Sequence, residues 1–297
     1  MRRLPQIALL QDGKRLHLQD GPIDLIVEAK GEDAAVRAAY DAAARRFDGL
    51  LDELCAELVE LRKAAHPKHC ALEGIVARRM HAAVAPFAAD RFITPMAAVA
   101  GSVAEEILGA MQSVAPLKRA YVNNGGDIAL HLEDDEQFCV GLMDRPDRQG
   151  VMRTMIVDAA DPSRGVATSG RHGRSFSLGI ADAVTVLART ASQADAAATI
   201  IANAVDLPGH PAVLRCPANE LQPDTDLGPR LVTRDVGELS EYEIHAALAA
   251  GETVARQLLA AGRIDGAVLF LLGQTAVVGT RGLDARQPEA RAALQFA

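Results

Sequence analysis

The chain has 297 residues, of which 49% are hydrophobic and 24% charged, with a formal net charge of −8. This length suits one large domain or two small ones, and the composition excludes an intrinsically disordered protein. The sequence has no Lys/Arg stripe and no apolar stretch of the ~20 residues that cross a membrane, so we expect neither nucleic acid nor membrane as a partner. Four cysteines without paired spacing indicate the reduced thiols of a cytoplasmic protein.

The N-terminal third is expected to contain strands followed by helices. Asp-Gly turns after apolar runs predict strands in the first thirty residues. Apolar spacing predicts a long helix from Glu32 to about Ala65, with Gly49 as the point where it breaks or bends. A second helix is expected from Leu72 to about Val84. A third opens at TPMAAVAG, with Thr94 as N-cap and Pro95 in its first turn.

Strands dominate the middle of the chain. RAYVNNGGDIALHL predicts a strand, a tight turn and a second strand, and FCVGLM, MRTMIVD and DAVTVLA predict three more. VATSG is expected to be a loop. Thr190 and Gln193 match a capping box, which predicts a helix from Ala191 to about Val205. The proline-rich region 208–228 is expected to be a loop.

The C-terminal part predicts one more helix, which begins at SEYEIH, and two strands around Gly273. Helices and strands thus occur without strict alternation. This order indicates the α+β class, with mixed or antiparallel sheets covered by helices.

Two short segments suit either a plain turn or a nucleotide contact. NNGGD tolerates positive φ and so predicts a hairpin turn, but its bare backbone also allows a planar or phosphorylated ligand to lie close, with Asp127 as a polar contact. TSG offers hydroxyls and a turn backbone to a phosphate, yet it has no P-loop lysine.

Asp195 and Thr199 are the polar pair inside an alanine-rich helix. Residues four apart share a helix face, so a carboxylate and a hydroxyl there suit Mg²⁺, which takes few protein ligands. The alternative is that Asp195 only favours the N-terminal helix dipole. A second cluster of metal-binding residue types matches no zinc template; it consists of His66, His69, Cys70 and His81.

The order of these segments is more specific than any one of them. YVNNGGDIAL, FCVGLMD, VATSG and AVTVLARTASQADAAAT in succession resemble the C-terminal half of the ApbE superfamily, which includes the FAD:protein FMN transferases. TPMAAVAG and GIADAVTV resemble an uncharacterised ApbE-like branch more closely. The resemblance covers about Phe92 to Val205. It implies a single α+β domain over residues 1–297, built from two similar halves, 1–115 and 116–297, with a flavin nucleotide in the cleft that separates them.

The resemblance also implies roles for individual residues. The metal, Mg²⁺, would be held by Asp195, Thr199 and a backbone carbonyl near Ala98 beside the FAD diphosphate. The residues that match the FAD-binding positions of the family are Gly125, Gly126, Asp127, Thr168, Ser169 and Gly170.

One feature of the transferases is missing. A His-Ile-Ile-Asp-Pro-like stretch, whose histidine is a candidate base, is absent between Gly170 and Ala183. His172 is the nearby histidine, in a position expected to be flexible, and the catalytic base is left unassigned. Three hypotheses follow: a Mg²⁺-dependent enzyme that cleaves or transfers across the diphosphate of FAD, a flavin (FAD or FMN) carrier without catalysis, or an enzyme for another ligand. The partners these hypotheses admit are a small-molecule nucleotide, an acceptor protein and a second copy in a homodimer.

Overall fold

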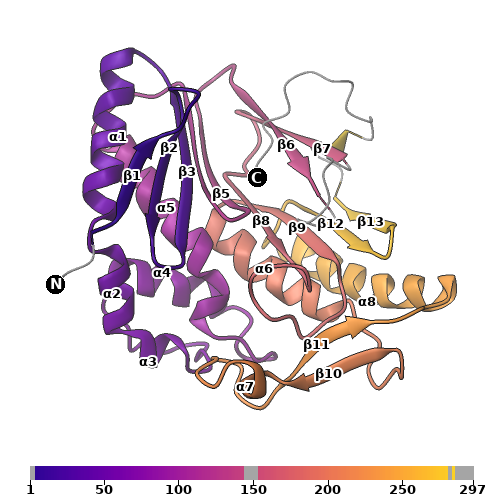
Figure 1. The fold of residues 1–297 in the computed structure, drawn as a ribbon. Helices are drawn as coiled ribbons and strands as arrows, with labels where there is room; N and C mark the ends of the chain where they lie inside the picture. The colour runs from indigo at the N-terminus through magenta and orange to yellow at the C-terminus, as the bar shows by residue number, and fades with distance from the viewer. Residues whose placement is uncertain (1–3, 144–152, 280–282, 285–297) are drawn as a thin grey trace. The chain divides into compact units, whose positions relative to one another are not determined.

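The computed structural model describes residues 4–143, 153–279 and 283–284 of the chain (Figure 1). Helices and antiparallel strand pairs are mixed, so the predicted α+β class is confirmed. The chain divides into two compact units. The first comprises Met1–Gln137, Asp158–Val166 and Thr190–Asp195, and the second comprises Phe138–Val157, Ala167–Arg189 and Ala196–Ala297.

The first unit contains an antiparallel sheet in which strands adjacent in the sequence pair with one another. Its strands are β1 (Gln6–Leu9), β2 (Leu16–Asp20), β3 (Ile23–Lys30), β4 (Arg119–Asn124) and β5 (Asp127–Leu132). Both Asp-Gly turns join the strands as predicted. The first two residues of β8 (Gly165–Ser169) pair with β5.

The helices of the first unit are shorter than the sequence suggests. The expected helix over 32–65 is divided at Gly49, which has a φ of +87° that only glycine adopts readily. The helices are α1 (Asp33–Phe47), α2 (Leu50–Ala56), α3 (Leu58–Leu61), α4 (Ile75–Val84), the 3₁₀ helix η1 (Pro95–Ala98) and α5 (Val99–Gln112). Thr94 precedes Pro95 as predicted, but its side chain makes no capping hydrogen bond.

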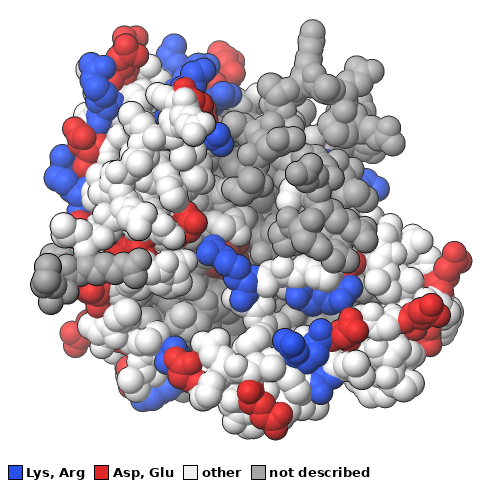
Figure 2. All heavy atoms as spheres, viewed as in Figure 1, with Lys and Arg blue, Asp and Glu red and all other residues white. Residues whose placement is uncertain are grey.

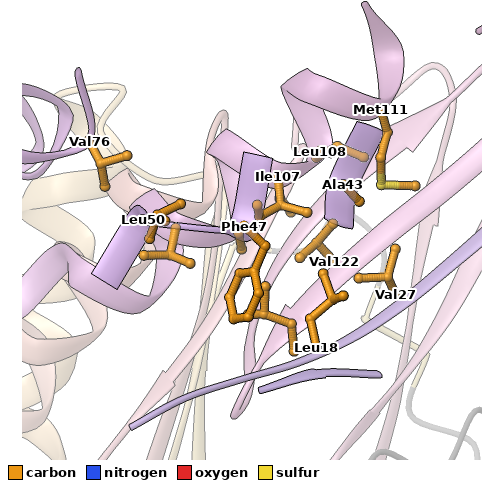
Figure 3. Packing of buried hydrophobic residues seen from close by; sticks show 14 of the residues in the cluster. Leu18, Val27, Ala43, Phe47, Leu50, Val76, Ile107, Leu108, Met111 and Val122 are labelled. Carbon is orange, nitrogen blue, oxygen red and sulfur yellow. The ribbon is translucent and has the colours of Figure 1, made fainter. Parts of the chain in front are cut away.

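The hydrophobic core of the first unit lies between its sheet and its helices. Leu18, Val27 and Val122 project from the strands toward Phe47 of α1 and Ile107 of α5 (Figure 3). All five side chains are completely buried. One face of α5 is therefore anchored in the core, which fixes the position of its N-terminal turn.

Most elements of the second unit are strands that pair antiparallel. They are β6 (Gln137–Leu142), β7 (Arg153–Asp158), β9 (Ala183–Ala188), β10 (Val213–Pro217), β11 (Leu231–Val236), β12 (Gly266–Leu271), β13 (Gln274–Val278) and β14 (Leu283–Asp284), with the helices α7 (Ala218–Leu221) and α8 (Glu241–Ala260). Strand β12 pairs with β9 and β13, and β10 pairs with β11. Helix α6 (Ala191–Ala204) begins in the first unit and ends in the second.

Two predicted loops are wrong. VATSG is strand through Ser169, because its first residues are paired to β5 and the loop begins only at Gly170. The proline-rich region 208–228 contains β10 and α7. Pro217 ends β10 without weakening it, since proline is tolerated at strand ends where no ladder N–H is needed.

The described surface bears mixed charge. Positive and negative side chains both occur on the face shown in Figure 2. Across the described ranges, no helix is long and apolar enough to span a membrane. None of the four cysteines forms a disulfide.

Candidate functional site

Helix α6 is packed with alanine and does not present a solvated face. The predicted start at Ala191 is confirmed, and the Thr190 hydroxyl accepts the backbone N–H of Gln193 at 3.4 Å, which is one half of the expected capping box. The alanines of this helix from Ala191 to Ala202 are completely buried. Gln193 is exposed, whereas Asp195 and Thr199 are half-buried among these alanines.

Asp195 lies at the N-terminal end of another helix. Its Oδ2 accepts the backbone N–H of Gly101 at 3.0 Å, and the carboxylate also accepts the N–H of Ala100. Both donors are in the first turn of α5, where N–H groups have no partner inside the helix. The helix dipole that Asp195 favours is therefore that of α5 rather than that of its own helix.

Among the described residues, no cationic side chain lowers the pKa of Asp195. Burial raises the pKa of its carboxyl from an ordinary 3.8 to about 7, against the lowering effect of the hydrogen bonds from Gly101 and Ala100, and the nearby charge of Glu105 raises it further. Part of the side chain stays accessible to solvent. A desolvated carboxylate without a cationic neighbour is the kind of group that a bound divalent cation stabilises.

Glu105 of α5 makes the matching contact to α6. Its Oε1 accepts the backbone N–H of Ser192 at 2.6 Å, and its Oε2 lies 3.3 Å from Nε of Arg79. Each helix therefore supplies a carboxylate to the first turn of the other. Gly101 permits this approach, since a Cβ there would lie 2.3 Å from the carbonyl oxygen of Ala191.

The predicted Gly-Gly turn is a two-residue hairpin. Gly125 and Gly126 have φ of +65° and +108°, and Asn124 pairs with Asp127 across the turn. The Oδ1 of Asn123 accepts the N–H of Gly126 at 2.8 Å. A Cβ at Gly126 would meet nothing within 4 Å, so the structure leaves open space beside this backbone.

The turn and Asp195 meet at the same helix end. Nδ2 of Asn124 donates to the carbonyl oxygen of Ala100 at 3.2 Å, and the N–H of the same peptide group, that of Gly101, donates to Asp195. Ala98, near which the metal-binding carbonyl is expected, is the N-cap of the same helix. Three of the predicted features of the first unit are thus brought to the start of α5.

The other predicted ligand-binding residues belong to the second unit. The hydroxyl of Thr168 is 2.8 Å from that of Thr185, and Thr168 and Ser169 end strand β8. Gly170 begins the following loop. Thr199 lies one turn beyond Asp195 on α6, so helix geometry puts the two side chains on one face.

His172 contacts a buried carboxylate. Its Nε2 lies 3.2 Å from Oδ1 of Asp182, which also pairs with Nη2 of Arg171 at 2.6 Å. The other oxygen of Asp182 accepts the N–H of Leu272 at 2.5 Å, and the side chain is 5% exposed. The loop is also closed on itself, since the N–H of Arg171 donates to the carbonyl of Ala181.

The metal-binding residue types of the histidine-rich segment are not gathered around one point. His66 and His69 contact each other edge to face with ring centroids 6.2 Å apart, and His81 bonds to the carbonyl of His66. Within the part of the chain that the structure describes, no three His, Cys, Asp or Glu residues are grouped to hold a metal. The site expected at Asp195 and Thr199 consists of one carboxylate, one hydroxyl and one backbone carbonyl, so it does not require three such residues.

Three residues that make contacts at these places were not predicted from the sequence. Asn124 stands beside the glycines of the turn, Asp182 lies in GIADAVTV, and Glu105 lies in the helix that TPMAAVAG opens. Asn124 and Asp182 lie inside segments that carried the resemblance, and Glu105 lies four residues beyond one. Their roles depend on contacts with distant parts of the chain, which residue spacing does not reveal.

Comparison with known proteins gives the following similarities. A family model described as AbpE bacteria matches residues 7–277. A UPF0280 protein of Methanopyrus kandleri is 36% identical over 183 residues, which are 61% of this chain and 69% of that protein. A UPF0280 protein of Archaeoglobus fulgidus is 41% identical over 113 residues, or 38% of this chain and 45% of that protein, so the match spans less than half of that relative.

A solved structure is also similar. The crystal structure of Pseudomonas stutzeri flavinyl transferase ApbE in its apo form shares 12% sequence identity with this chain. The superposition covers 92% of this chain and 94% of the other, with a TM-score of 0.48.

Proposed function

The chain belongs to the family described as AbpE bacteria, an ApbE-like family that includes UPF0280 relatives, and from this premise we propose that it binds a flavin nucleotide, FAD or FMN, together with Mg²⁺. We propose further that it acts on the diphosphate bond of FAD, by cleavage or by transfer of FMN. The match of its segments to the flavin-binding and metal-binding positions of the ApbE superfamily supports both statements.

One observation carries the proposal. At the start of α5, Asp195 is a desolvated carboxylate whose hydrogen-bond donors are backbone N–H groups, and the turn that contains Gly125 and Gly126 is tied to the same helix end through Asn124. A carboxylate needed only for packing would be less costly to bury with a cationic partner. The residues present therefore fit a divalent cation.

The roles of the residues follow from their chemistry. Asp195 and Thr199 would hold Mg²⁺, and the glycine turn would let the nucleotide approach the backbone. Thr168, Ser169 and the loop at Gly170 would contact phosphate. When bound, Mg²⁺ supplies a positive charge that stabilises the diphosphate as its bond breaks.

A second candidate is flavin binding without transfer. The histidine nearest to the missing segment, His172, already contacts the buried Asp182, which Arg171 also contacts. The expected histidine stretch is absent from the sequence. Binding through metal and phosphate contacts needs no base, so it would persist in such a carrier.

Calorimetric titration of FAD in the presence and absence of Mg²⁺ tests the proposal. We expect Asp195→Ala and Thr199→Val to remove the Mg²⁺-dependent part of the affinity. Thr253→Val is a control, because Thr253 is exposed on α8 and its hydroxyl donates to the carbonyl of Ala249. Equal Mg²⁺-dependent affinity in wild type and Asp195→Ala would refute the metal site, and no binding of either flavin would favour another ligand.

A further inference from the structure

We propose that Glu105 is a positioning residue, which holds the first turn of α6 so that Asp195 is presented to the cation. This role rests on the proposed function, because it concerns the same metal site. Glu105 would not touch the cation or the nucleotide. It would act through the backbone of Ser192, three residues before Asp195 on the same helix.

The two oxygens of Glu105 have separate partners. Oε1 accepts the N–H of Ser192 at 2.6 Å, and Oε2 pairs with Nε of Arg79 at 3.3 Å. Nη1 of Arg79 also donates to the carbonyl of Ser102 at 3.0 Å, on the same helix as Glu105. The carboxylate is therefore held at both ends, and its direction toward α6 is fixed.

Helix α5 provides a rigid base for this contact. Val103, Ile107 and Met111 on the same helix are completely buried in the core of the first unit. In Figure 3 the side chains of Ile107 and Met111 project toward the strands. Helix α5 cannot shift without disturbing this packing. Glu105, which extends from α5, therefore holds the first turn of α6 in one position.

The opposite contact closes a ring of interactions. Glu105 binds the start of α6, α6 carries Asp195, and Asp195 binds the N–H of Gly101, one turn before Glu105 on α5. Loss of the Glu105 contact would free the first turn of α6 and let Asp195 rotate from its orientation. Residues that orient metal ligands in this way typically alter metal affinity by about 10- to 100-fold when removed.

Glu106 provides a matched control. It is adjacent in sequence and pairs with Arg79 at 2.9 Å and with Arg46 at 2.7 Å. Glu106, Arg79 and Arg46 all lie outside α6. Removal of Glu106 therefore disturbs the same arginine and the same helix while the bond to Ser192 remains.

The test is Mn²⁺ binding measured by electron paramagnetic resonance on the full chain, with melting temperatures recorded for each metal-free variant. We expect Glu105→Ala to weaken Mn²⁺ binding at least tenfold and Glu106→Ala to leave it within about twofold of wild type. Glu105→Gln keeps an oxygen for Ser192 and should recover most of the affinity. Amide hydrogen exchange at residues 192–195 should rise in Glu105→Ala and stay at the wild-type level in Glu106→Ala.

The possible outcomes separate this role from the metal site itself. Wild-type Mn²⁺ affinity in Glu105→Ala overturns the positioning role, and so does an equal loss in both alanine variants. A wild type that binds no Mn²⁺ refutes the proposed metal site directly, before any variant is compared, and removes the positioning role with it.

Discussion

Asp195 and Glu105 cap each other's helices. The carboxylate of Asp195 on α6 accepts the N–H of Gly101 in the first turn of α5, and that of Glu105 on α5 accepts the N–H of Ser192 in the first turn of α6. Negative charge is favourable at a helix N-terminus, so each contact is stabilising by itself. The two negative charges also repel, and only Glu105 has an arginine to offset its charge.

This asymmetry predicts how stability depends on pH in the metal-free protein. The pKa of Asp195 is about 7 in the folded state and near 3.8 when unfolded. The folded state therefore keeps a proton that the unfolded state has lost, so the stability contributed by this proton is complete below 3.8 and is lost as pH rises to about 7. Asp195→Asn has no such proton, and it should gain on the order of 2 kcal/mol over wild type from pH 5 to pH 8.

Urea unfolding at both pH values, with a chelator present, measures this difference. Addition of Mg²⁺ at pH 8 should stabilise wild type and leave Asp195→Asn unchanged, because a ligand that binds the folded state stabilises it. A constant difference between the two proteins at pH 5 and pH 8 would show that the carboxyl is ionised throughout this range.

The close approach of α5 and α6 predicts opposite effects of alanine at two glycines of one helix. A Cβ at Gly101 would lie 2.3 Å from the carbonyl oxygen of Ala191, which is backbone and cannot turn aside, whereas a Cβ at Gly109 meets nothing within 4 Å. Gly101→Ala should destabilise by about 1 to 3 kcal/mol through overpacking. Gly109→Ala should stabilise by up to about 1 kcal/mol through helix propensity.

Thermal or urea unfolding of the two variants checks this contrast. The unfolding of Gly101→Ala also tests the geometry around Asp195 and Glu105, because this substitution must push the start of α6 away from α5. If Gly101→Ala unfolds like wild type, the two helices do not approach as closely as the structure places them, and the contacts of Asp195 and Glu105 would need revision.

The hairpin turn predicts a loss of binding that exceeds the loss of stability. Alanine at Gly126 is strained by the φ of +108°, but its methyl group would occupy open space beside the turn. Gly13 has a φ of +67° and equally open surroundings in the β1–β2 hairpin. Both variants should therefore melt at lower temperature, while Gly126→Ala alone should weaken FAD binding, by at least about tenfold.

Titration of FAD into both folded variants distinguishes the alternatives. Equal FAD affinity in Gly126→Ala and Gly13→Ala would leave the turn with a structural role only. This pair is a sharper test than a large side chain at Gly126, because a methyl group at either glycine meets nothing within 4 Å.

Local signals in the sequence identified most elements but not the way they meet. Asp-Gly turns and the Thr190 cap were sufficient to place strands and the start of α6, since turn and cap preferences act within a few residues. The strand that ends in Thr168 and Ser169 was missed because it is short and is stabilised by pairing with β5. Such pairing depends on tertiary context rather than on propensity.

The candidate site was predictable only in its residue types. The spacing of Asp195 and Thr199 suggested metal ligands, yet it gave no indication that the carboxylate would bind the first turn of α5. The partner Glu105 is 87 residues away from Ser192 in the sequence. Contacts at that separation have no local pattern, so they became visible only in the folded chain.

The buried carboxylate of Asp182 predicts a large stability effect in the second unit. It pairs with Arg171, whose side chain is only 12% exposed, and with His172. Asp182→Asn would leave a largely buried guanidinium without its counter-charge, which costs about 3 to 5 kcal/mol. Glu252→Gln, in an exposed pair with Arg256, should cost less than about 1 kcal/mol in the same urea unfolding experiment. Equal losses would show that Asp182 is hydrated in solution.

The contact of His172 with Asp182 also affects whether this histidine can act as a catalytic base. We expect transfer of FMN to a protein serine or threonine to be weak or absent although flavin binding persists, since the expected histidine stretch is missing and His172 is engaged with Asp182. Loss of a positioned base costs about 10²- to 10⁴-fold in rate. Incubation with FAD, Mg²⁺ and an acceptor domain, followed by fluorescence of covalent flavin on a denaturing gel, measures the transfer.

An intact ApbE transferase assayed in parallel sets the rate for comparison. A rate for this chain that matches that enzyme would contradict the expectation and show that another residue supplies the base. His172→Ala then decides whether that residue is His172, with flavin affinity measured alongside to separate catalysis from binding. An unchanged rate in His172→Ala would exclude it, because removal of the imidazole leaves Asp182 paired with Arg171 and the loop in place.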